Sequence, residues 1–306
     1  MTGMYAVTQI LSFEKNNTME GGFWMSTYSG LVYYDKNMES WYDVEHELVF
    51  GKPINNIIKD TDGNLWIDMN GELVLFNTAA FYYQYGSIAE TDIVLVERDI
   101  KNKQSILDVS LSSMASHPQY GTWLGTPRGV SKKVDLVDVF STFVLGYPGI
   151  EKLFVDKNNN LWCSSETGLH QFDDRGTTNR NFVSDPTDVN TLISNESGPF
   201  LIDNQRNVIW VASKFSGLSK IELGFDLRTG KEFVTKQRVK RFVYSKEDNN
   251  TVLDGGINEM YLDKEGNVFL SFKDGVVIIN EDGLQRHEFS DQIGNYHLSD
   301  ISSFIE

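Results

Sequence analysis

The sequence of 306 residues predicts an all-β fold made from repeats of one small unit. A first observation is a sequence motif that recurs at residues 54–66, 150–162 and 257–269. It consists of a short apolar run, a polar turn, and a second run that opens on a large aromatic residue. A second observation is that five of the six tryptophans occupy the same position of the repeat. A third is a period of about 40–50 residues, which is typical of propellers and other repeat arrays.

The second strand of the unit can be aligned in six copies, each followed by a glycine that begins a third strand. Period-two alternation of β-branched and aromatic residues in these runs indicates strands, and glycine suits the turn between them. The shared aromatic position is occupied by Trp24, Trp66, Trp123, Trp162, Trp210 and Phe269. We interpret these rings as structural residues that fill the wedge between neighbouring units, and not as sugar-stacking platforms. Trp41 lies outside this position and is the better candidate for an exposed contact.

A fourth run follows in most units, for example at residues 140–144 and 240–244, and no segment shows convincing helical periodicity. Four short antiparallel strands per unit predict a β-propeller. We predict one domain over residues 1–306, with blades at roughly 7–53, 54–104, 105–149, 150–195, 196–256 and 257–300. Residues 301–306 resemble the first strand of a seventh blade or a strand that closes the ring, so either six or seven blades are expected.

Two units depart from the pattern in the turn between their first and second strands. Residues 15–22 replace this turn in the first unit, and residues 112–120 replace it in the third. We expect longer or differently shaped turns at both places.

The charge balance restricts the partners. The chain carries 43 acidic and 27 basic residues, a formal net charge of -16. Such a field repels phosphate backbones and anionic lipid headgroups, so neither nucleic-acid binding nor membrane insertion is expected. No run approaches the length of about 18 apolar residues that a membrane helix needs, and the first residues lack the pattern of a signal peptide. The single cysteine, Cys163, follows Trp162 and is expected to be a small buried hydrophobic residue.

The repeat resembles the two-component-regulator propeller repeat, which is found in the sensor region of hybrid two-component systems of gut Bacteroidetes. The linker at residues 184–195 shares a second trait of that family, an Asp-Pro turn followed by Asn-Thr-Leu and Ser-Asn. Residues 245–253 contain a shorter version of the same linker motif. The resemblance implies a non-catalytic sensory propeller, periplasmic or extracytoplasmic, that responds to an oligosaccharide. It also implies that the chain is a fragment of a larger ectodomain that forms a homodimer, and that any kinase activity lies outside this chain.

The polar turns contain Asp60, Asp156 and Asp263 at equivalent positions. Oxygen-bearing residues at alternate positions resemble a calcium loop, but the same residues suit a tight hairpin turn, and no bidentate Glu follows. We interpret these aspartates as structural, with calcium as the alternative. The five histidines show no metal-ligand spacing, so no metal and no cofactor are expected.

The loops between second and third strands are the predicted ligand-binding face, since they gather around the channel with the loops that lead into the first strands. Their side chains could hydrogen-bond a polar or anionic ligand, or be simply solvated. The candidates are Tyr28, Asn70, Arg128, Glu166, Lys214 and Lys273. Two other functions stay open: a structural or protein-interaction scaffold on a cell surface or virion, and a propeller lyase or hydrolase. An enzyme of that class would need a cluster of His, Glu and Arg on one face of the channel.

Overall fold

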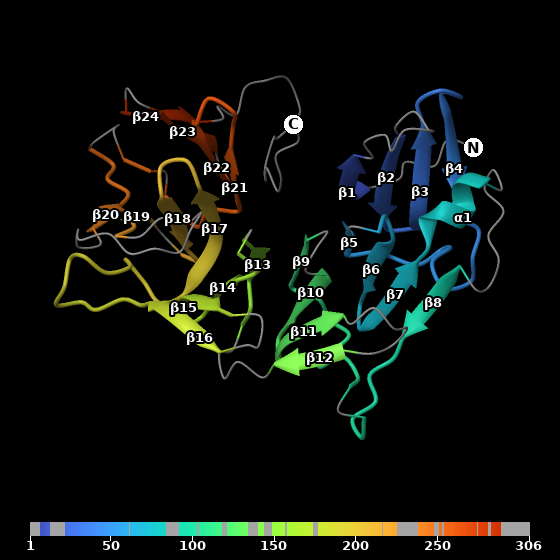
Figure 1. Cartoon of the computed structure of the whole chain (residues 1–306). Helices are drawn as coiled ribbons and strands as arrows, with labels where there is room; N and C mark the ends of the chain where they lie inside the picture. Colours follow the sequence, from blue (N-terminus) through green and yellow to red (C-terminus); the bar gives the residue numbers. More distant parts are fainter. Residues whose placement is uncertain are drawn as a thin grey trace. The chain divides into compact units, whose positions relative to one another are not determined.

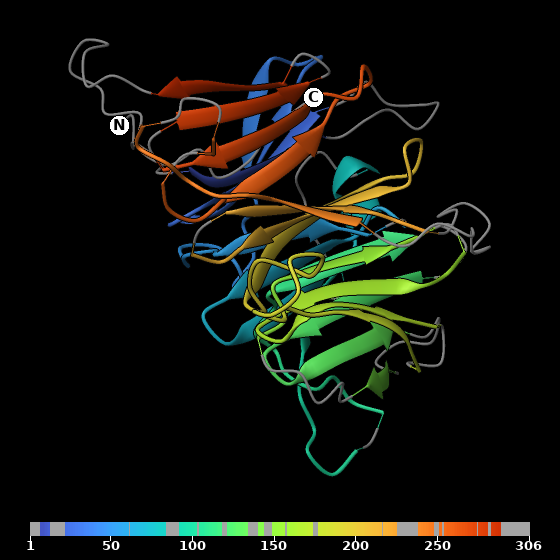
Figure 2. The same cartoon turned by 90° about the vertical axis from the view of Figure 1, so that its left-hand side faces the viewer.

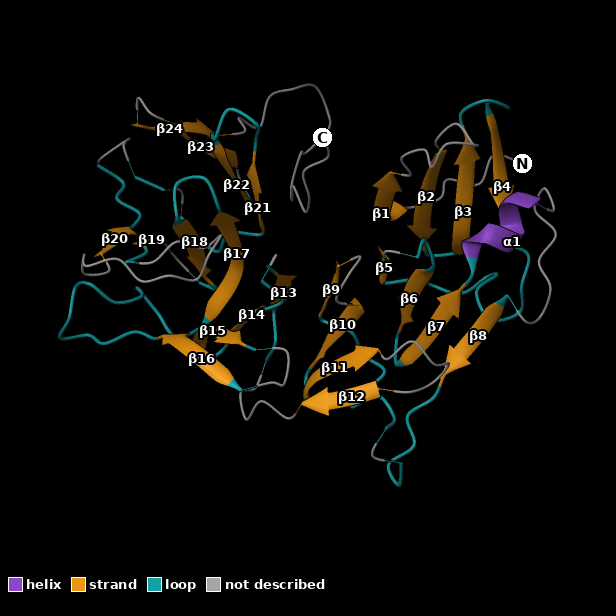
Figure 3. Ribbon diagram, in the orientation of Figure 1, coloured by secondary structure: helices purple, strands orange, loops and turns teal. Residues whose placement is uncertain are grey.

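The structure is a computed structural model, and its strands and helix are labelled in Figure 1 and coloured by type in Figure 3. It describes residues 7–12, 22–60, 62–83, 92–102, 104–117, 121–133, 140–143, 149–156, 158–173, 177–215, 217–224, 238–247, 251–252, 254–273, 275–280 and 283–288. Within these residues, twenty-four strands form six four-stranded antiparallel sheets. The predicted class, an all-β propeller of four-stranded antiparallel blades, is therefore confirmed.

The contacts of the chain group it into two compact units, Met1–Leu145 and Gly146–Glu306. The first unit holds three blades. Blade 1 contains β1 (Val7–Ser12), β2 (Gly22–Thr27), β3 (Gly30–Asp35) and β4 (Ser40–Asp43). Blade 2 contains β5 (Asn56–Lys59), β6 (Leu65–Met69), β7 (Glu72–Phe76) and β8 (Ile93–Val96). Blade 3 contains β9 (Ser113–His117), β10 (Gly121–Thr126), β11 (Gly129–Lys133) and β12 (Phe140–Phe143).

The second unit holds the other three blades. Blade 4 contains β13 (Lys152–Val155), β14 (Leu161–Ser165), β15 (Gly168–Phe172) and β16 (Thr178–Phe182). Blade 5 contains β17 (Ser197–Asp203), β18 (Val208–Ser213), β19 (Leu218–Glu222) and β20 (Arg238–Phe242). Blade 6 contains β21 (Glu259–Leu262), β22 (Val268–Phe272), β23 (Gly275–Asn280) and β24 (Gly283–Glu288). Figure 2 shows the strands of blade 6, in orange and red, side by side in one sheet.

Strands that are consecutive in sequence are neighbours in every sheet, as in a β-meander. Each of the six predicted blade ranges contains the four strands of one sheet. A single domain over the whole chain stays a prediction, and the expected strand at residues 301–306 lies outside the described residues.

The structure corrects the expectation for the third unit. Residues 113–117 were predicted to belong to a turn, but they form β9 and pair with β10 from Ser113 opposite Gly125 to His117 opposite Gly121. The segment is polar and lacks the apolar alternation of a strand. Backbone pairing with β10 and a 2.9 Å hydrogen bond between the Ser116 and Thr122 hydroxyl groups place it in the sheet. The remaining residues of the predicted turn, 118–120, and residues 15–21 of the first unit lie outside the described residues.

A short helix, α1 (Thr78–Tyr83), follows β7 where no helix was predicted. Six residues are too few to show a 3.6-residue period, so the sequence pattern does not indicate this helix. The Asn77 side chain caps the helix by accepting a hydrogen bond from the amide of Ala79 at 3.2 Å. The helix carries Phe81, which is 3% exposed and lies 5.1 Å from the ring of Trp24.

The repeated tryptophans lie in the cores of the units. Trp24 packs edge-on against Phe76 of blade 2, with ring centroids 5.5 Å apart, and Trp66 contacts Phe140 of blade 3 in the same manner. In the second unit, Trp162 and Trp210 belong to one apolar cluster that continues from blade 4 to blade 6. The five tryptophans in this position are between 0 and 6% exposed.

The linkers between blades in the second unit are held by arginines of the outer strands. Arg241 of β20 donates to the carbonyl oxygens of Asp188, Thr191 and Leu192 at 2.9–3.0 Å. Arg286 of β24 holds the shorter linker that contains Thr251 in the same way. The outer strand of each of these blades therefore fixes the linker that leads into its own blade.

Candidate functional site

The turns between second and third strands share a hydroxyl group that closes the hairpin. In blade 1 the Thr27 hydroxyl donates to the Gly30 carbonyl at 2.8 Å and accepts from the Ser29 amide at 3.0 Å. Thr126 does the same in blade 3, with distances of 2.9 and 3.3 Å. Ser165 holds the equivalent turn of blade 4. Because the backbone polar groups are satisfied from within, the side chains at the tips of these turns remain available for other partners.

The tips present the residues that the sequence singled out. Tyr28 is 64% exposed, and Arg128 and Glu166 are also exposed. The blade 2 turn is built differently, since Asn70 and Gly71 both adopt positive φ, of 42° and 94°. This two-residue Asn-Gly turn suits the twist of a tight hairpin and leaves Asn70 exposed.

Three of these tip residues meet the segments that lead into first strands. Asn55 donates to Asn70 at 3.1 Å in blade 2, and Arg128 forms a 2.8 Å ion pair with Asp108 in blade 3. In the second unit, Lys214 of blade 5 forms a 2.6 Å ion pair with Glu151, which precedes β13 of blade 4. Within each unit, the two kinds of loop therefore lie at one edge of the blades, as the geometry of a four-stranded blade requires.

Lys214 lies in an acidic setting. Its hydrogen bond and ion pair with Glu151 raise its pKa, and the nearby charges of Glu166 and Glu196 act in the same direction. A second ion pair joins Lys152 of β13 to Glu259 of β21, two first strands that belong to blades 4 and 6. This edge of the second unit therefore presents charged donors, Lys152 and Lys214, beside charged acceptors, Glu151 and Glu259.

Asp68 of β6, in the first unit, is a polar residue near the turn of blade 2 that the sequence did not single out. It is 7% exposed at a position of the second strand where the other blades carry Ser, Gly or Ala. Burial raises its pKa, while hydrogen bonds from the Asn55 side chain and the Leu111 backbone act in the opposite direction. Its Oδ1 atom has no hydrogen-bond partner within the described residues. The sequence signal was present, since a carboxylate breaks a run of small residues at one position of the repeat.

Lys273 and two aromatic residues are also exposed. Lys273 is exposed in the blade 6 turn, next to a residue outside the described ranges. Phe215, beside Lys214, is 65% exposed, and Trp41 is 58% exposed and lies against Tyr34 at 4.5 Å on the outer part of blade 1. Because Tyr28, Asn70 and Arg128 belong to one unit and the other three candidates to the second, a ring formed by all six stays a prediction.

The aspartates of the polar turns act as hydrogen-bond acceptors. Asp60 accepts from the amides of Asp62 and Asn64, from the Asn64 side chain and from the indole N–H of Trp66, all at 2.9–3.1 Å. A carboxylate that caps four donors of its own hairpin has a structural task. In the part of the chain that the structure describes, no group of three or more His, Cys, Asp or Glu side chains is arranged to hold a metal.

His170 is a buried histidine of the second unit. Its Nδ1 lies 3.0 Å from Asn181 Oδ1, and its Nε2 lies 3.1 Å from the Thr167 hydroxyl. Burial lowers its pKa, against the effect of the hydrogen bond with Asn181. His46 accepts a hydrogen bond from the Leu48 amide. These two histidines therefore hold local structure. Cys163 is fully buried, and burial raises the pKa of its thiol to about 12.

No protein-family model and no curated protein matches the sequence. The structure is similar to the extracellular domain of a hybrid two-component system from B. thetaiotaomicron, with 16% identity and a TM-score of 0.62. That match covers 96% of this chain and 35% of the ectodomain, so the chain spans about a third of the length of its relative. Similarity at this level of identity establishes the fold, and it agrees with the repeat resemblance in the sequence.

Two further solved structures share the fold. Streptogramin B lyase is similar with 9% identity and a TM-score of 0.56, over 94% of this chain and 90% of the enzyme. PorZ, a surface component of the type-IX secretion system of Porphyromonas gingivalis, is similar with 13% identity and a TM-score of 0.50, over 92% of this chain and 44% of PorZ. No helix within the described ranges is long and apolar enough to cross a membrane. Fold and comparisons together define a β-propeller of four-stranded blades, a class that includes an extracellular domain of a two-component system, an enzyme and a surface component.

Proposed function

We propose that this chain is a non-catalytic, ligand-binding propeller of an extracytoplasmic sensor, and that its ligand is an oligosaccharide. The observation that carries the proposal is made within each unit: Asn70 and Arg128 in the first, and Lys214 in the second, meet the segments that lead into first strands. The turns that bear Tyr28 and Arg128 are closed by the hydroxyl groups of Thr27 and Thr126, so the Tyr28 and Arg128 side chains are not needed to close them. Tyr28 and Phe215 add exposed aromatic surface to the same kind of turn.

The chemistry of this edge suits a neutral polyol. Ion pairs such as Lys214–Glu151 provide donors and acceptors at fixed positions, and aromatic rings contact the apolar faces of sugars. The similarity to a two-component ectodomain supports a sensory role, in which binding changes the disposition of two ectodomain copies and so biases a distant kinase. Kinase activity and dimer formation belong to the longer protein in this proposal.

Isothermal titration calorimetry of the chain against a panel of neutral and charged oligosaccharides tests the proposal. We expect one class to bind, and Tyr28→Ala and Arg128→Ala to weaken that binding about tenfold each. Met38→Ala, at an exposed position in the turn between β3 and β4, is the matched control and should bind normally. Absence of binding across the panel, or unchanged affinity in both turn variants, would remove the proposal.

A protein-interaction scaffold is the second candidate, because the similarity to PorZ shows this fold in a bacterial surface component. A scaffold would recognise a protein through exposed side chains such as Trp41 and Phe215. Trp41→Ala and Phe215→Ala would then abolish capture of a defined protein partner, whereas the oligosaccharide panel would remain silent. The lyase alternative has less support, since His46 and His170 are used in local hydrogen bonds.

A further inference from the structure

A groove lies between blades 5 and 6, away from the turns that bear the proposed oligosaccharide site. Its volume is about 620 Å³, and its walls come from β17, β18, β19 and β20 on one side and from β22, β23 and β24 on the other. All seven strands belong to the second unit. The volume falls in the range of pockets that hold small organic ligands, roughly 300–1,000 Å³.

The groove exists because this junction between blades is filled with smaller residues than its counterpart in the first unit. Between blades 1 and 2, Phe76 of β7 and Phe81 of helix α1 both contact the ring of Trp24. In blade 6 the position of Phe76 is taken by Ile279, as the pairing of Phe76 with Leu65 and of Ile279 with Val268 shows. At the place where blade 2 has the helix, Gly283 begins β24 and pairs with Asn280 of β23. Less side-chain volume at the same position leaves the space open.

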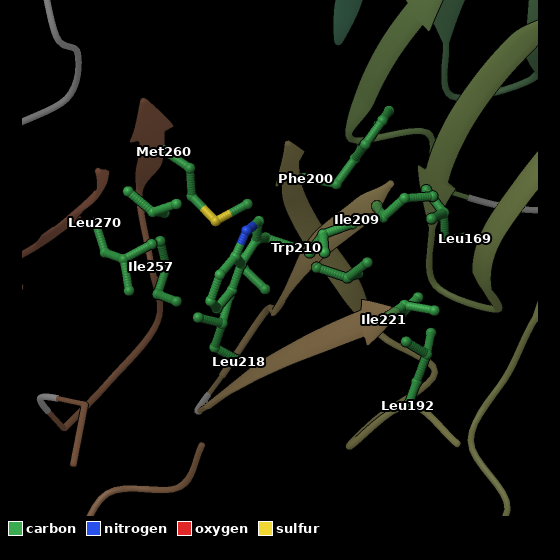
Figure 4. Packing of buried hydrophobic residues seen from close by; sticks show 14 of the residues in the cluster. Leu169, Leu192, Phe200, Ile209, Trp210, Leu218, Ile221, Ile257, Met260 and Leu270 are labelled. Atoms are coloured by element: carbon green, nitrogen blue, oxygen red, sulfur yellow. The ribbon is translucent and has the colours of Figure 1, made fainter. Parts of the chain in front are cut away.

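The floor of the groove is apolar and partly aromatic. Trp210 lies at its base and packs beside Met260 and Ile257 of the next blade (Figure 4). Val268 and Leu284 form the opposite wall. This floor suits the flat face of a ring.

The rim of the groove is cationic, although the chain as a whole carries a net charge of -16. Lys220 of β19 and Lys240 of β20 are directly opposite each other in the strand register. Like charges opposite each other on neighbouring strands destabilise a sheet. Arg206 adds a third cation and spans the junction, since it binds Asp203 at 3.0 Å and the Gly266 carbonyl of blade 6 at 3.1 Å.

Among the described side chains around the groove, these three cations outnumber two carboxylates, Asp203 and Glu222. Asp203 is balanced by Arg206, and Lys220 lies 3.3 Å from Glu222 while its ammonium group is 5.6 Å from the Trp210 ring. Lys240 lies over the ring of Phe242, at 4.8 Å. An anion between Lys220 and Lys240 would relieve their repulsion and gain charge-assisted hydrogen bonds.

We infer that this groove is a binding site for a ring-bearing organic anion, in which a carboxylate or sulfate meets Lys220 and Lys240 and the ring lies toward Trp210. A sugar acid and an aromatic acid share this chemistry. The inference goes beyond the proposed function, because the site lies on strands of blades 5 and 6 and not on the turns that bear Tyr28 and Arg128.

Calorimetric titration of the full chain with two matched pairs of compounds tests the inference. Cellobiouronate is compared with neutral cellobiose, and 2-naphthoate with neutral 2-naphthylmethanol. We expect at least one acid to bind about tenfold or more tightly than its neutral counterpart, since the anion alone meets the two lysines. The acid that binds identifies the source of the ring.

The double variant Lys220→Gln/Lys240→Gln should lose about tenfold in affinity for that acid, and binding to the wild type should weaken with added salt. Lys246→Gln, an exposed lysine in the same unit, is the matched control and should bind as the wild type does. A second readout needs no ligand: Lys240→Gln should raise Tm at low salt, because it removes the facing charge.

Equal affinities for acid and neutral compounds, or full affinity in the double variant, would overturn the inference. Neutral oligosaccharides that bind and depend on Tyr28 would support the proposed function in either case. Failure of the groove and failure of the turn site are therefore distinguishable.

Discussion

Trp162 donates its indole N–H to a carboxylate oxygen of Asp156, 2.9 Å away, across the turn that joins β13 to β14. The same carboxylate accepts hydrogen bonds from the amides of Asn158 and Asn160. One buried acidic side chain therefore closes the hairpin and fixes the orientation of the ring that packs between blades. Asp60 and Trp66 repeat this relationship in blade 2, at 3.1 Å.

Replacement of Asp156 by alanine should destabilise the protein by about 2–4 kcal/mol, because several buried donors lose their acceptor together. Denaturant unfolding followed by tryptophan fluorescence measures the effect. Asp263→Ala is the informative comparison, since Phe269 in that blade has no N–H to donate, and its effect should be smaller. Asp62→Ala, at an exposed position of the blade 2 turn, should be nearly neutral. Equal losses for Asp156 and Asp263 would show that the indole hydrogen bond adds nothing.

His170 should make the stability depend on pH between neutral and mildly acidic conditions. Burial lowers its pKa below the ordinary value of 6.5. At a pH between the folded and unfolded pKa values, the histidine is therefore protonated in the unfolded chain and neutral in the folded chain. The contribution of His170 is therefore present above pH 6.5 and is lost as the pH falls toward its folded pKa. Unfolding free energies measured from pH 7.5 to 5 should fall more steeply for the wild type than for His170→Gln. Parallel curves would contradict this assignment.

Asp68 should be a carboxylate that costs stability at neutral pH. Its pKa is raised by burial, so its favourable contribution is present only below the ordinary value of 3.8 and is lost as the pH rises through the folded pKa. Asp68→Asn keeps the shape and removes the charge, and we expect a gain of about 1 kcal/mol at pH 7, or about 2–4 °C in Tm. The gain should shrink as the pH approaches 4. A loss of stability at pH 7 would indicate that the charge is compensated.

Gly168 begins β15 at a place that only glycine fits. Its φ is 124°, and an added Cβ would lie 2.3 Å from the carbonyl oxygen of Phe182 on the neighbouring strand. Gly168→Ala should therefore cost more than about 2 kcal/mol, since it combines an unfavourable φ with a backbone clash. Gly63→Ala shares the positive φ, at 89°, but meets open space. The difference between the two variants in thermal unfolding isolates the clash, and equal effects would refute it.

Arg241→Lys should loosen the linker before blade 5 without unfolding the blades. The guanidinium group reaches three carbonyl oxygens and the Thr191 hydroxyl, which a single ammonium group cannot do from one position. Hydrogen exchange of residues 184–195 should accelerate, while exchange in β18 stays slow. Arg238→Lys, at the exposed beginning of β20, is the control. Unchanged exchange in the linker of Arg241→Lys would show that the contacts are not needed there.

The sequence alone determined the repeat and with it the fold class. Trp162 and its counterparts recur because each blade must bury a large ring against its neighbour, and Asp156 recurs because each hairpin needs an acceptor for its own amides. Constraints that act on one blade recur in most copies, although the first and third units lack the turn that contains aspartate. They can therefore be recognised without any relative, and the propeller of four-stranded blades was predicted from them.

Features that depend on residues far apart in the sequence were decided only by the tertiary structure. The strand at Ser113–His117 is polar and is held by backbone pairing, so its pattern did not indicate a strand. Lys220 and Lys240 face each other because β19 and β20 are neighbours, and the groove beside them exists because Ile279 is smaller than Phe76. The free volume and the net charge at a junction between blades depend on side chains from several strands. The sequence of a single repeat does not show how its side chains combine with those of the next blade. This is the physical reason why the groove could not be predicted from the sequence.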